Sequence, residues 1–190
     1  MDRSLTASYR DDTVWREDMY FIETETLGLK AYSHDDDHDM YVCWQDIDTQ
    51  KGYNGVFSKT FDEFRVFDIE RFRFWVTAVN KNTGESVGTL RLGLDEKCPD
   101  LAIWIYPKHR NKGYGAAAFK LALAYIFENF DYEEISAGCY CDNVYSLKML
   151  NKIGFMRYPK GDETEINCFT GNETTQLEFR IRKSDFIANL

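Results

Sequence analysis

The segment Leu101-Ala-Ile-Trp-Ile-Tyr-Pro107, continued by Lys108-His-Arg-Asn-Lys-Gly-Tyr-Gly-Ala116, organises the whole chain. Its first part is an apolar run rich in β-branched and aromatic residues, which is typical of a strand buried on both faces. Pro107 lacks an N–H group and ends the hydrogen-bonded ladder. A long apolar helix then runs to about Phe130. The segment therefore predicts a strand, a loop and a helix in direct succession.

The loop between this strand and this helix predicts a binding site for an anion. It carries three cations, Lys108, Arg110 and Lys112, and two glycines, Gly113 and Gly115. Glycine has no Cβ, so backbone N–H groups can approach a ligand closely. The helix directs its free N–H groups and the positive end of its dipole to the same place. A pyrophosphate is the expected ligand, and a helix-start turn with solvated cations is the structural alternative.

Two well-known phosphate loops match this loop less well. Gly113-Tyr-Gly-Ala-Ala-Ala118 fits the loose dinucleotide pattern G-x-G-x-x-A. In a dinucleotide-binding unit, however, the glycines follow the strand directly and an acid ends the next strand. Here residues 108–112 intervene, and Glu133 and Glu134 precede the next strand. The P-loop signature is absent, so a nucleotide-dependent oxidoreductase stays open on the glycine match alone.

A second motif follows the long helix. An apolar strand, Ile135–Tyr140, leads into Asn143-Val-Tyr-Ser-Leu-Lys-Met-Leu-Asn-Lys-Ile-Gly-Phe155. We expect Asp142 or Asn143 to cap a helix here, and Gly154 to end it in the left-handed conformation. The buried stripe of this helix is predicted to consist of Val144, Leu147, Leu150 and Ile153.

Together the two motifs resemble the GNAT superfamily of acetyl-coenzyme-A-dependent N-acyltransferases. The resemblance rests on Arg110-x-x-Gly113-x-Gly115 and then Asn143-x-x-Ser146-x-x-x-Leu150-x-x-x-Gly154-Phe155. Within the superfamily, the chain looks most like the ribosomal-protein N-terminal alanine acetyltransferases. The resemblance implies a layered α+β fold in which helices flank a central mixed, twisted sheet of about six to seven strands. This sheet is expected to splay between the strand ending near Pro107 and the strand starting near Ile135.

The rest of the chain supplies further strands. One strand is predicted within Tyr20–Tyr32, and a hairpin joins Phe72–Asn80 to Ser86–Gly93. Phe155–Tyr158 and Gln176–Arg182 are expected to close the sheet, with a loop between them.

A helix is predicted after the first strand. Ser33 and Asp36 have the spacing of a capping box, and the helix is expected to reach Trp44 or Asp48. The alternative for this segment is a metal site built from His34, His38 and the neighbouring aspartates.

The resemblance implies that acetyl-CoA is the cosubstrate and that no metal takes part. Acetyl-CoA would lie where the two strands splay apart, with its diphosphate on the backbone N–H groups of residues 110–115. Asn143 would bond the cosubstrate near its thioester. The implied cosubstrate-binding residues are Ile105, Tyr106, Arg110, Asn111, Lys112, Gly113, Tyr114, Gly115, Ala116, Asn143 and Ser146.

The resemblance also implies a direct attack of an amine on the thioester. One proton must leave the amine and another must reach the departing thiolate. In many superfamily members, a tyrosine that acts as general acid stands where this chain has Leu150. The alanine-acetyltransferase branch shows the same loss, and Ser146 is the implied substitute, with Asn143 as the second catalytic candidate. No base is assigned; Tyr140, Asp142 and His109 are the candidates.

The acceptor remains open at this point. In the family, the region after the first strand forms one wall of the acceptor pocket, which makes Trp44, Tyr53 and Phe57 pocket candidates. The segment from Tyr32 to Phe67 carries no motif that selects a protein N-terminus over a small-molecule amine. A polyamine- or aminoglycoside-type acetyltransferase and a non-catalytic module that binds acyl-CoA are the alternative functions.

Length and composition limit the remaining possibilities. The 190 residues suit one acetyltransferase domain over residues 20–190 after a polar N-terminal extension over residues 1–19. A net charge of −9 argues against nucleic acid as the partner. Neither a membrane span nor a secretory signal is expected, which favours a cytoplasmic location. The five cysteines are odd in number and indicate no disulfide framework, and a homodimer is left open.

Overall fold

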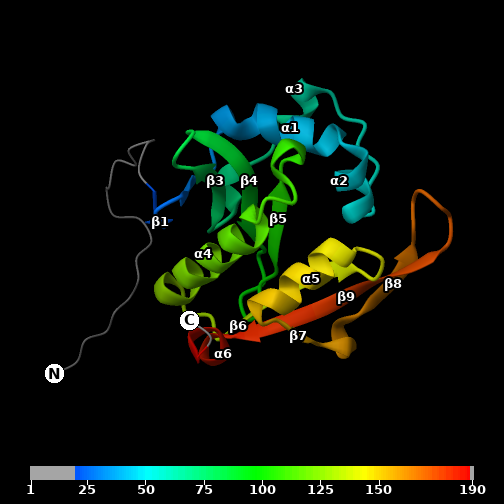
Figure 1. The fold of residues 1–190 in the computed structure, drawn as a ribbon. Helices are drawn as coiled ribbons and strands as arrows, with labels where there is room; N and C mark the ends of the chain where they lie inside the picture. The colour runs from blue at the N-terminus through cyan, green and yellow to red at the C-terminus, as the bar shows by residue number, and fades with distance from the viewer. Residues whose placement is uncertain (1–19, 189–190) are drawn as a thin grey trace.

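The computed structural model describes residues 20–188, in which nine strands form two sheets (Figure 1). The first sheet is antiparallel throughout and contains β1 Ile22–Glu23, β2 Leu27–Ala31, β3 Trp75–Asn80, β4 Glu85–Leu92 and β5 Leu101–Ile105, in that order. The second sheet has β9 Glu173–Arg182 at its centre, between β6 Glu134–Tyr140 and β7 Met156–Arg157. β8 Glu163–Ile166 pairs with the N-terminal part of β9.

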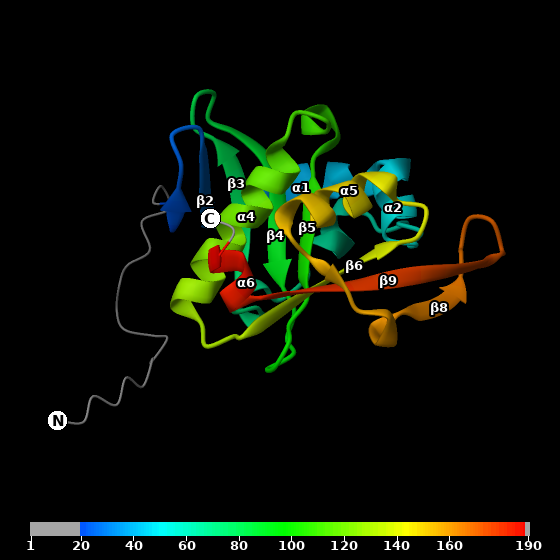
Figure 2. The same cartoon turned by 60° about the horizontal axis from the view of Figure 1, so that its bottom comes forward.

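The two sheets meet at a single point of their edges. An isolated parallel bridge joins Asp100 to Ser136, and the Ser136 N–H donates to the Pro99 carbonyl at 3.1 Å. Beyond this bridge, β5 pairs only with β4 and β6 pairs only with β9, so the two strands diverge (Figure 2). The predicted α+β fold, splayed between these two strands, is confirmed. The predicted single mixed sheet of about six to seven strands is instead two antiparallel sheets, because β5 and β6 share only one isolated parallel bridge.

Helices cover both faces of the first sheet. α4 Tyr114–Asn129 lies across one face, and α5 Val144–Ile153 packs beside it and against β6 (Figure 1). α1 Asp37–Gln45, with α2 Ile47–Gly52 and α3 Phe61–Phe64, lies on the opposite face. α6 Lys183–Ala188 ends the described chain. One apolar core therefore lies under α4, and a second, largely aromatic core lies under α1.

Local sequence signals account for several element ends. The Ser33 side chain and Asp36 form the predicted capping box ahead of α1, and α1 ends within the predicted range. Gly154 has φ 109° and terminates α5, as predicted. Asp37 is fully buried, where it accepts a hydrogen bond from the Tyr32 hydroxyl at 2.7 Å. Within residues 20–188, no group of three or more His, Cys, Asp or Glu side chains could hold a metal.

Three local details also differ from the sequence-based expectations. The first predicted strand is broken in two, because the Thr24 N–H donates to the Leu27 carbonyl and forms a turn. β8 was expected to be a loop, but it extends the sheet through its backbone pairing with β9. Val144 was expected in the buried stripe of α5, yet it is 50% exposed because α5 begins at the rim of the core.

The predicted extension over residues 1–19 lies outside the described residues, so the division into extension and domain stays a prediction. Between residues 20 and 188, no helix is both long enough and apolar enough to cross a membrane.

Candidate active site

The loop between β5 and α4 presents a row of backbone N–H groups without acceptors. Asn111 and Gly113 have left-handed backbones, with φ 60° and 86°, which turns neighbouring peptide groups toward one concave side. None of the N–H groups from Asn111 to Ala116 bonds an acceptor within residues 20–188, and the first such bond runs from Ala117 to Gly113. A Cβ built on Gly113 would meet no atom within 4 Å, so the space over the loop is open. The loop therefore has the geometry that a diphosphate requires.

The Arg110 side chain is bound within the protein. Its guanidinium donates to the Ile105 carbonyl at 3.2 Å, to Asp46 at 2.8 Å and to the Thr49 hydroxyl. Burial alone would raise the pKa of Asp46, but the Thr49 N–H and Arg110 outweigh it and hold that pKa below its usual range. The Arg110 N–H itself donates to the Pro107 carbonyl. The row of free N–H groups thus begins one residue later than predicted, and Arg110 ties α2 to the end of β5.

At the free edge of β5, the backbone N–H groups are available to a ligand, whereas the backbone carbonyl groups are already bonded. Tyr106 donates its N–H to Val87 on β4, and because bonded residues alternate along an antiparallel strand, Ile103 and Ile105 face away from β4. The Ile103 carbonyl accepts from the Tyr53 hydroxyl at 2.6 Å, and the Ile105 carbonyl accepts from Arg110. The N–H groups of Ile103 and Ile105 have no acceptor among the described residues. This edge can therefore bond the carbonyl groups of an extended ligand.

Two of the predicted loop residues direct their side chains elsewhere. The Tyr106 hydroxyl bonds the Thr89 hydroxyl at 2.9 Å inside the aromatic core, and burial raises its pKa. The Tyr114 hydroxyl accepts a hydrogen bond from Asn80 at 2.8 Å at the end of β3. Any contact of these two residues with the cosubstrate therefore comes from their backbone.

Asn143 and Ser146 lie together at the start of α5. The Asn143 side-chain oxygen accepts from the Ser146 N–H at 3.1 Å, which confirms Asn143 as the cap of α5. A Cβ built on Gly52 would lie 3.6 Å from the Asn143 amide nitrogen, so Asn143 faces the end of α2. Ser146 is half-buried, and its hydroxyl has no partner in the described part of the chain. Leu150 is 2% exposed and belongs to the core.

Gly115 lies where α4 packs closely against α5 and β5. A Cβ built there would lie 3.2 Å from the Met149 sulfur on α5 and 3.6 Å from the Ile105 side chain on β5. A larger residue would push α4 and α5 apart. Gly115 therefore supports the loop through packing as well as through its backbone N–H.

The two residues that follow α2 link the first sheet, through β5, to the second sheet, through β8. Tyr53 holds the Ile103 carbonyl on β5, and the next residue, Asn54, donates to Glu165 at 2.7 Å and to the Ile166 carbonyl at 3.0 Å on β8. Sequence analysis missed Asn54 and Glu165, because their contact joins positions 111 residues apart.

The candidate bases differ in their protonation and their surroundings. Tyr140 donates to Glu165; burial and this bond raise the Tyr140 pKa, and the same bond lowers the Glu165 pKa. Burial, followed by the charge of Lys108, lowers the pKa of His109, whose Nε2 has no partner among the described residues. Asp142 is exposed beside the cap of α5. Glu165 therefore places a carboxylate on the Tyr140 hydroxyl at the C-terminal end of β6.

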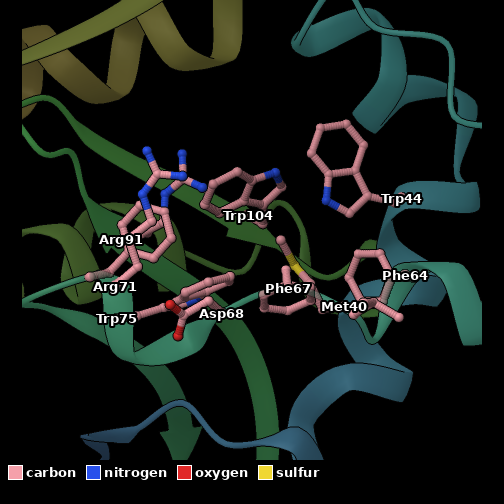
Figure 3. A pocket seen from close by; sticks show the side chains of 11 residues that line it. Met40, Trp44, Phe64, Phe67, Asp68, Arg71, Trp75, Arg91 and Trp104 are labelled. Atoms are coloured by element: carbon pink, nitrogen blue, oxygen red, sulfur yellow. The ribbon is translucent and has the colours of Figure 1, made fainter.

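An aromatic cavity of about 450 Å³ lies on the face of the sheet opposite α4 (Figure 3). Trp44, one of the three predicted pocket residues, lines it; Phe57 packs against Trp44 with ring centroids 5.9 Å apart. Tyr53 lies behind the cavity and stacks on Trp104 at 5.0 Å. The aromatic lining consists of Trp44, Phe64, Phe67, Phe72, Trp75 and Trp104.

Sequence comparisons relate the chain to a known family. The sequence pattern of the acetyltransferase (GNAT) domain family matches residues 4–156. The uncharacterized N-acetyltransferase YnaD of Bacillus subtilis (strain 168) is 34% identical over 166 residues, which cover 75% of this chain and 90% of YnaD.

Solved structures show the same fold. A GNAT-family acetyltransferase from Bacillus anthracis superposes with a TM-score of 0.71 at 22% identity, covering 87% of this chain and 99% of that protein. Spermidine N-acetyltransferase from Vibrio cholerae, in complex with CoA and spermine, gives a TM-score of 0.76 at 16% identity, covering 86% of this chain and 99% of that protein. At these identities, the two structures support the fold and not the acceptor.

Proposed function

Since the chain belongs to the GNAT family and is an N-acetyltransferase, we propose that it transfers the acetyl group of acetyl-CoA directly to a primary amine where β5 and β6 diverge. Acetyl-CoA is the acetyl donor of this family. The observation that carries the proposal is the row of acceptor-free N–H groups from Asn111 to Ala116 at the start of α4. These groups would hold the diphosphate, and Gly113 leaves room for it.

The edge of β5 would orient the rest of the cosubstrate. The free N–H groups of Ile103 and Ile105 can donate to its amide and thioester carbonyls. A donor held in place against the thioester oxygen stabilises the charge that develops there when the amine attacks. Holding both reactants side by side contributes up to ~7–11 kcal/mol in well-oriented systems.

The two proton transfers would use different residues next to the point where β5 and β6 diverge. As the amine nitrogen attacks the carbonyl carbon, the Tyr140 hydroxyl can accept the amine proton while it passes its own proton to Glu165. As the carbon–sulfur bond breaks, the Ser146 hydroxyl can donate to the departing thiolate. Asn143 positions Ser146 through the cap of α5.

The acceptor is the less determined part of the proposal. The motif resemblance favours a protein N-terminus, as in the alanine-acetyltransferase branch. A small-molecule amine is equally compatible with the site, and one structural relative acts on spermidine according to its name. A cytoplasmic location and a homodimer also remain predictions.

A thermal melt with acetyl-CoA, free CoA and NADH tests the cosubstrate assignment. We expect acetyl-CoA and CoA to raise the melting temperature and NADH to leave it unchanged. A shift with NADH alone would refute the assignment of the loop. Release of free thiol in the presence of any amine would separate the enzyme from a non-catalytic module that only binds acyl-CoA.

A further inference from the structure

Arg91 is a half-buried cation that has no carboxylate partner among residues 20–188. It lies on β4 opposite Ala102 and lines the aromatic cavity. The other half-buried arginines of the described chain are paired: Arg110 with Asp46 at 2.8 Å and Arg180 with Glu134 at 3.0 Å. None of the ion pairs within residues 20–188 involves Arg91. In a chain of net charge −9, an unpaired cation beside a cavity needs an explanation.

Aromatic rings surround the Arg91 guanidinium. Its central carbon lies 4.6 Å from the centre of the Phe72 ring, 5.7 Å from that of Trp75 and 5.5 Å from that of Trp104. Figure 3 shows Arg91 beside Trp104, with Trp44 and Phe64 on the opposite side of the cavity. Such stacking fixes the position of the guanidinium, but the ring faces accept none of its N–H hydrogen bonds in the plane of the fork.

The covered polar atoms next to Arg91 in the described chain are hydrogen-bond donors. The Arg91 Nε and the indole nitrogens of Trp75 and Trp104 are covered by protein and have no acceptor in the described part of the chain. Trp104 is 5% exposed, so water does not compensate. A covered donor without an acceptor destabilises the fold. The terminal nitrogens of Arg91 are not covered in this way and reach the cavity. An oxyanion bonded to them would complement this wall.

The cavity also adjoins the proposed reaction site. Trp104 lies between Ile103 and Ile105 on β5, whose N–H groups are proposed to hold the cosubstrate. Tyr53 links the two, since it bonds the Ile103 carbonyl and stacks on Trp104. A molecule in this cavity would therefore lie next to the strand that presents the thioester.

We propose that the acceptor is a small amine that also carries a carboxylate on an apolar or aromatic frame, and that Arg91 binds this carboxylate. The inference rests on the proposed function, because it names the acceptor class for that reaction. The six aromatic residues of the cavity would surround the frame, and the amine would point to β5. Asp68 and Arg71 add one charge of each sign at the exposed rim, so the positive charge of Arg91 remains dominant inside.

This acceptor class differs from a polyamine. A polycation would have to approach Arg91 without a carboxylate to neutralise it, and like charges in a partly desolvated cavity repel. A protein N-terminus without an acidic side chain would place no negative charge against Arg91 and would leave this partly buried cation without a counterion.

Matched acceptor pairs test the inference. The pairs are 4-(aminomethyl)benzoate and 4-(aminomethyl)benzamide, 6-aminohexanoate and its amide, and L-tryptophan and its amide, with spermidine as the polycation. Thiol release from acetyl-CoA is followed for each, and rates are normalised to the free-amine fraction. Within at least one pair, we expect the carboxylate to have about 10–100-fold higher kcat/KM, the range that charge-assisted hydrogen bonds allow.

Variants at Arg91 separate binding from folding. In Arg91→Met, which keeps the apolar stem, we expect the ratio within the preferred pair to fall to about one, while the rate with the amide is retained. Arg91→Lys should retain part of the preference, because it keeps the charge and loses the fork. Arg73→Gln is the matched control: Arg73 is exposed, does not line the cavity, and should leave the ratio unchanged.

The outcomes distinguish this inference from the proposed function. Equal or faster turnover of the amides or of spermidine would overturn the inference, as would a carboxylate preference that survives in Arg91→Met, or a panel with no acetylated member. If acetyl-CoA still raises the melting temperature in those cases, the proposed function stands. Absence of that thermal shift in the unmodified protein would overturn both.

Discussion

Replacing Gly113 with glutamate places a carboxylate in the proposed diphosphate site. Gly113 has φ 86°, and a residue with a Cβ pays about 1–2 kcal/mol for that conformation. The helix dipole offsets about 0.3–1 kcal/mol of this cost, because the new carboxylate lies at the N-terminus of α4. For a domain of this size, 1 kcal/mol changes the melting temperature by about 2–4 °C. Without ligand, we therefore expect a loss of only a few degrees.

The effect on acetyl-CoA binding should be much larger. A carboxylate about 5 Å from one phosphate charge costs about 3 kcal/mol at an effective dielectric constant of 20, which weakens binding more than 100-fold. In the unmodified protein, acetyl-CoA at 100 times its Kd contributes about 2.7 kcal/mol, or about 5–11 °C. At the same concentration, the Gly113→Glu protein should gain at most about 0.4 kcal/mol, or about 1 °C.

Two other glycines provide matched controls. Gly84 and Gly171 have φ 73° and 72°, and a Cβ built on either would meet no atom within 4 Å, as at Gly113. Gly84→Glu and Gly171→Glu should therefore lose similar stability and keep the full shift with acetyl-CoA. A full shift in Gly113→Glu would refute the assignment of the loop. Loss of the shift in all three proteins would show that the effect does not arise at the loop.

Four further substitutions test the remaining site residues. Asn143→Ala should cost about 1 kcal/mol of stability for the lost cap and should also reduce the rise in melting temperature with acetyl-CoA. Ser33→Ala, which removes the cap ahead of α1, should lower stability without affecting that rise. Equal behaviour of the two variants would remove Asn143 from the site. Ser146→Ala should lower kcat by about 100-fold with little change in KM if its hydroxyl assists the thiolate; an unchanged kcat would leave it a structural role. Because the bond from Tyr140 lowers the pKa of Glu165, the acid limb of the pH–rate profile should lie below the ordinary pKa range of glutamate. Glu165→Gln should reduce the rate and abolish this limb. If the limb persists, Glu165 is excluded as the proton acceptor. Arg110→Ala should lower the free energy of unfolding by about 1–2 kcal/mol in chemical denaturation. Because the folded pKa of Asp46 is lowered, this stabilisation is present above the unfolded pKa of Asp46 and is lost as the pH falls through the folded pKa. The stability difference between the two proteins should therefore shrink in acid, and a pH-independent difference would contradict the pairing.

The parts of the fold that the sequence predicts are those where one residue leaves the backbone few choices. Pro107 ends β5, Gly113 and Gly154 adopt positive φ at the ends of helices, and Ser33 caps its own segment. β8 gives no such signal, because all four of its residues are exposed and alternation has no buried face to mark. Its existence depends on backbone pairing with β9, which no local pattern of side chains records.

The site divides in the same way. The acceptor-free N–H groups of the loop between β5 and α4 could be predicted, because its glycines and its helix start are neighbours in sequence. The role of the Arg110 side chain could not, because its partner Asp46 lies 64 positions away. In the sequence, Arg91 resembles an ordinary residue of a hairpin strand, and only the fold shows that no carboxylate of the described chain pairs with it. Long-range pairing, and its absence, is the information that the sequence alone does not reveal.

The edge of β5 connects the two substrates of the proposed reaction. Its outward carbonyls would repel the carbonyl oxygen of a thioester, and both are already bonded, by Tyr53 and by Arg110. Both caps depend on α2: Tyr53 follows its last residue, and Arg110 is held by Asp46 at its start. The same segment supports the cavity wall, because Tyr53 stacks on Trp104. If this edge orients acetyl-CoA and the cavity takes the acceptor, as we propose, changes in α2 that alter the cavity should also disturb the edge, which couples the two specificities in this protein.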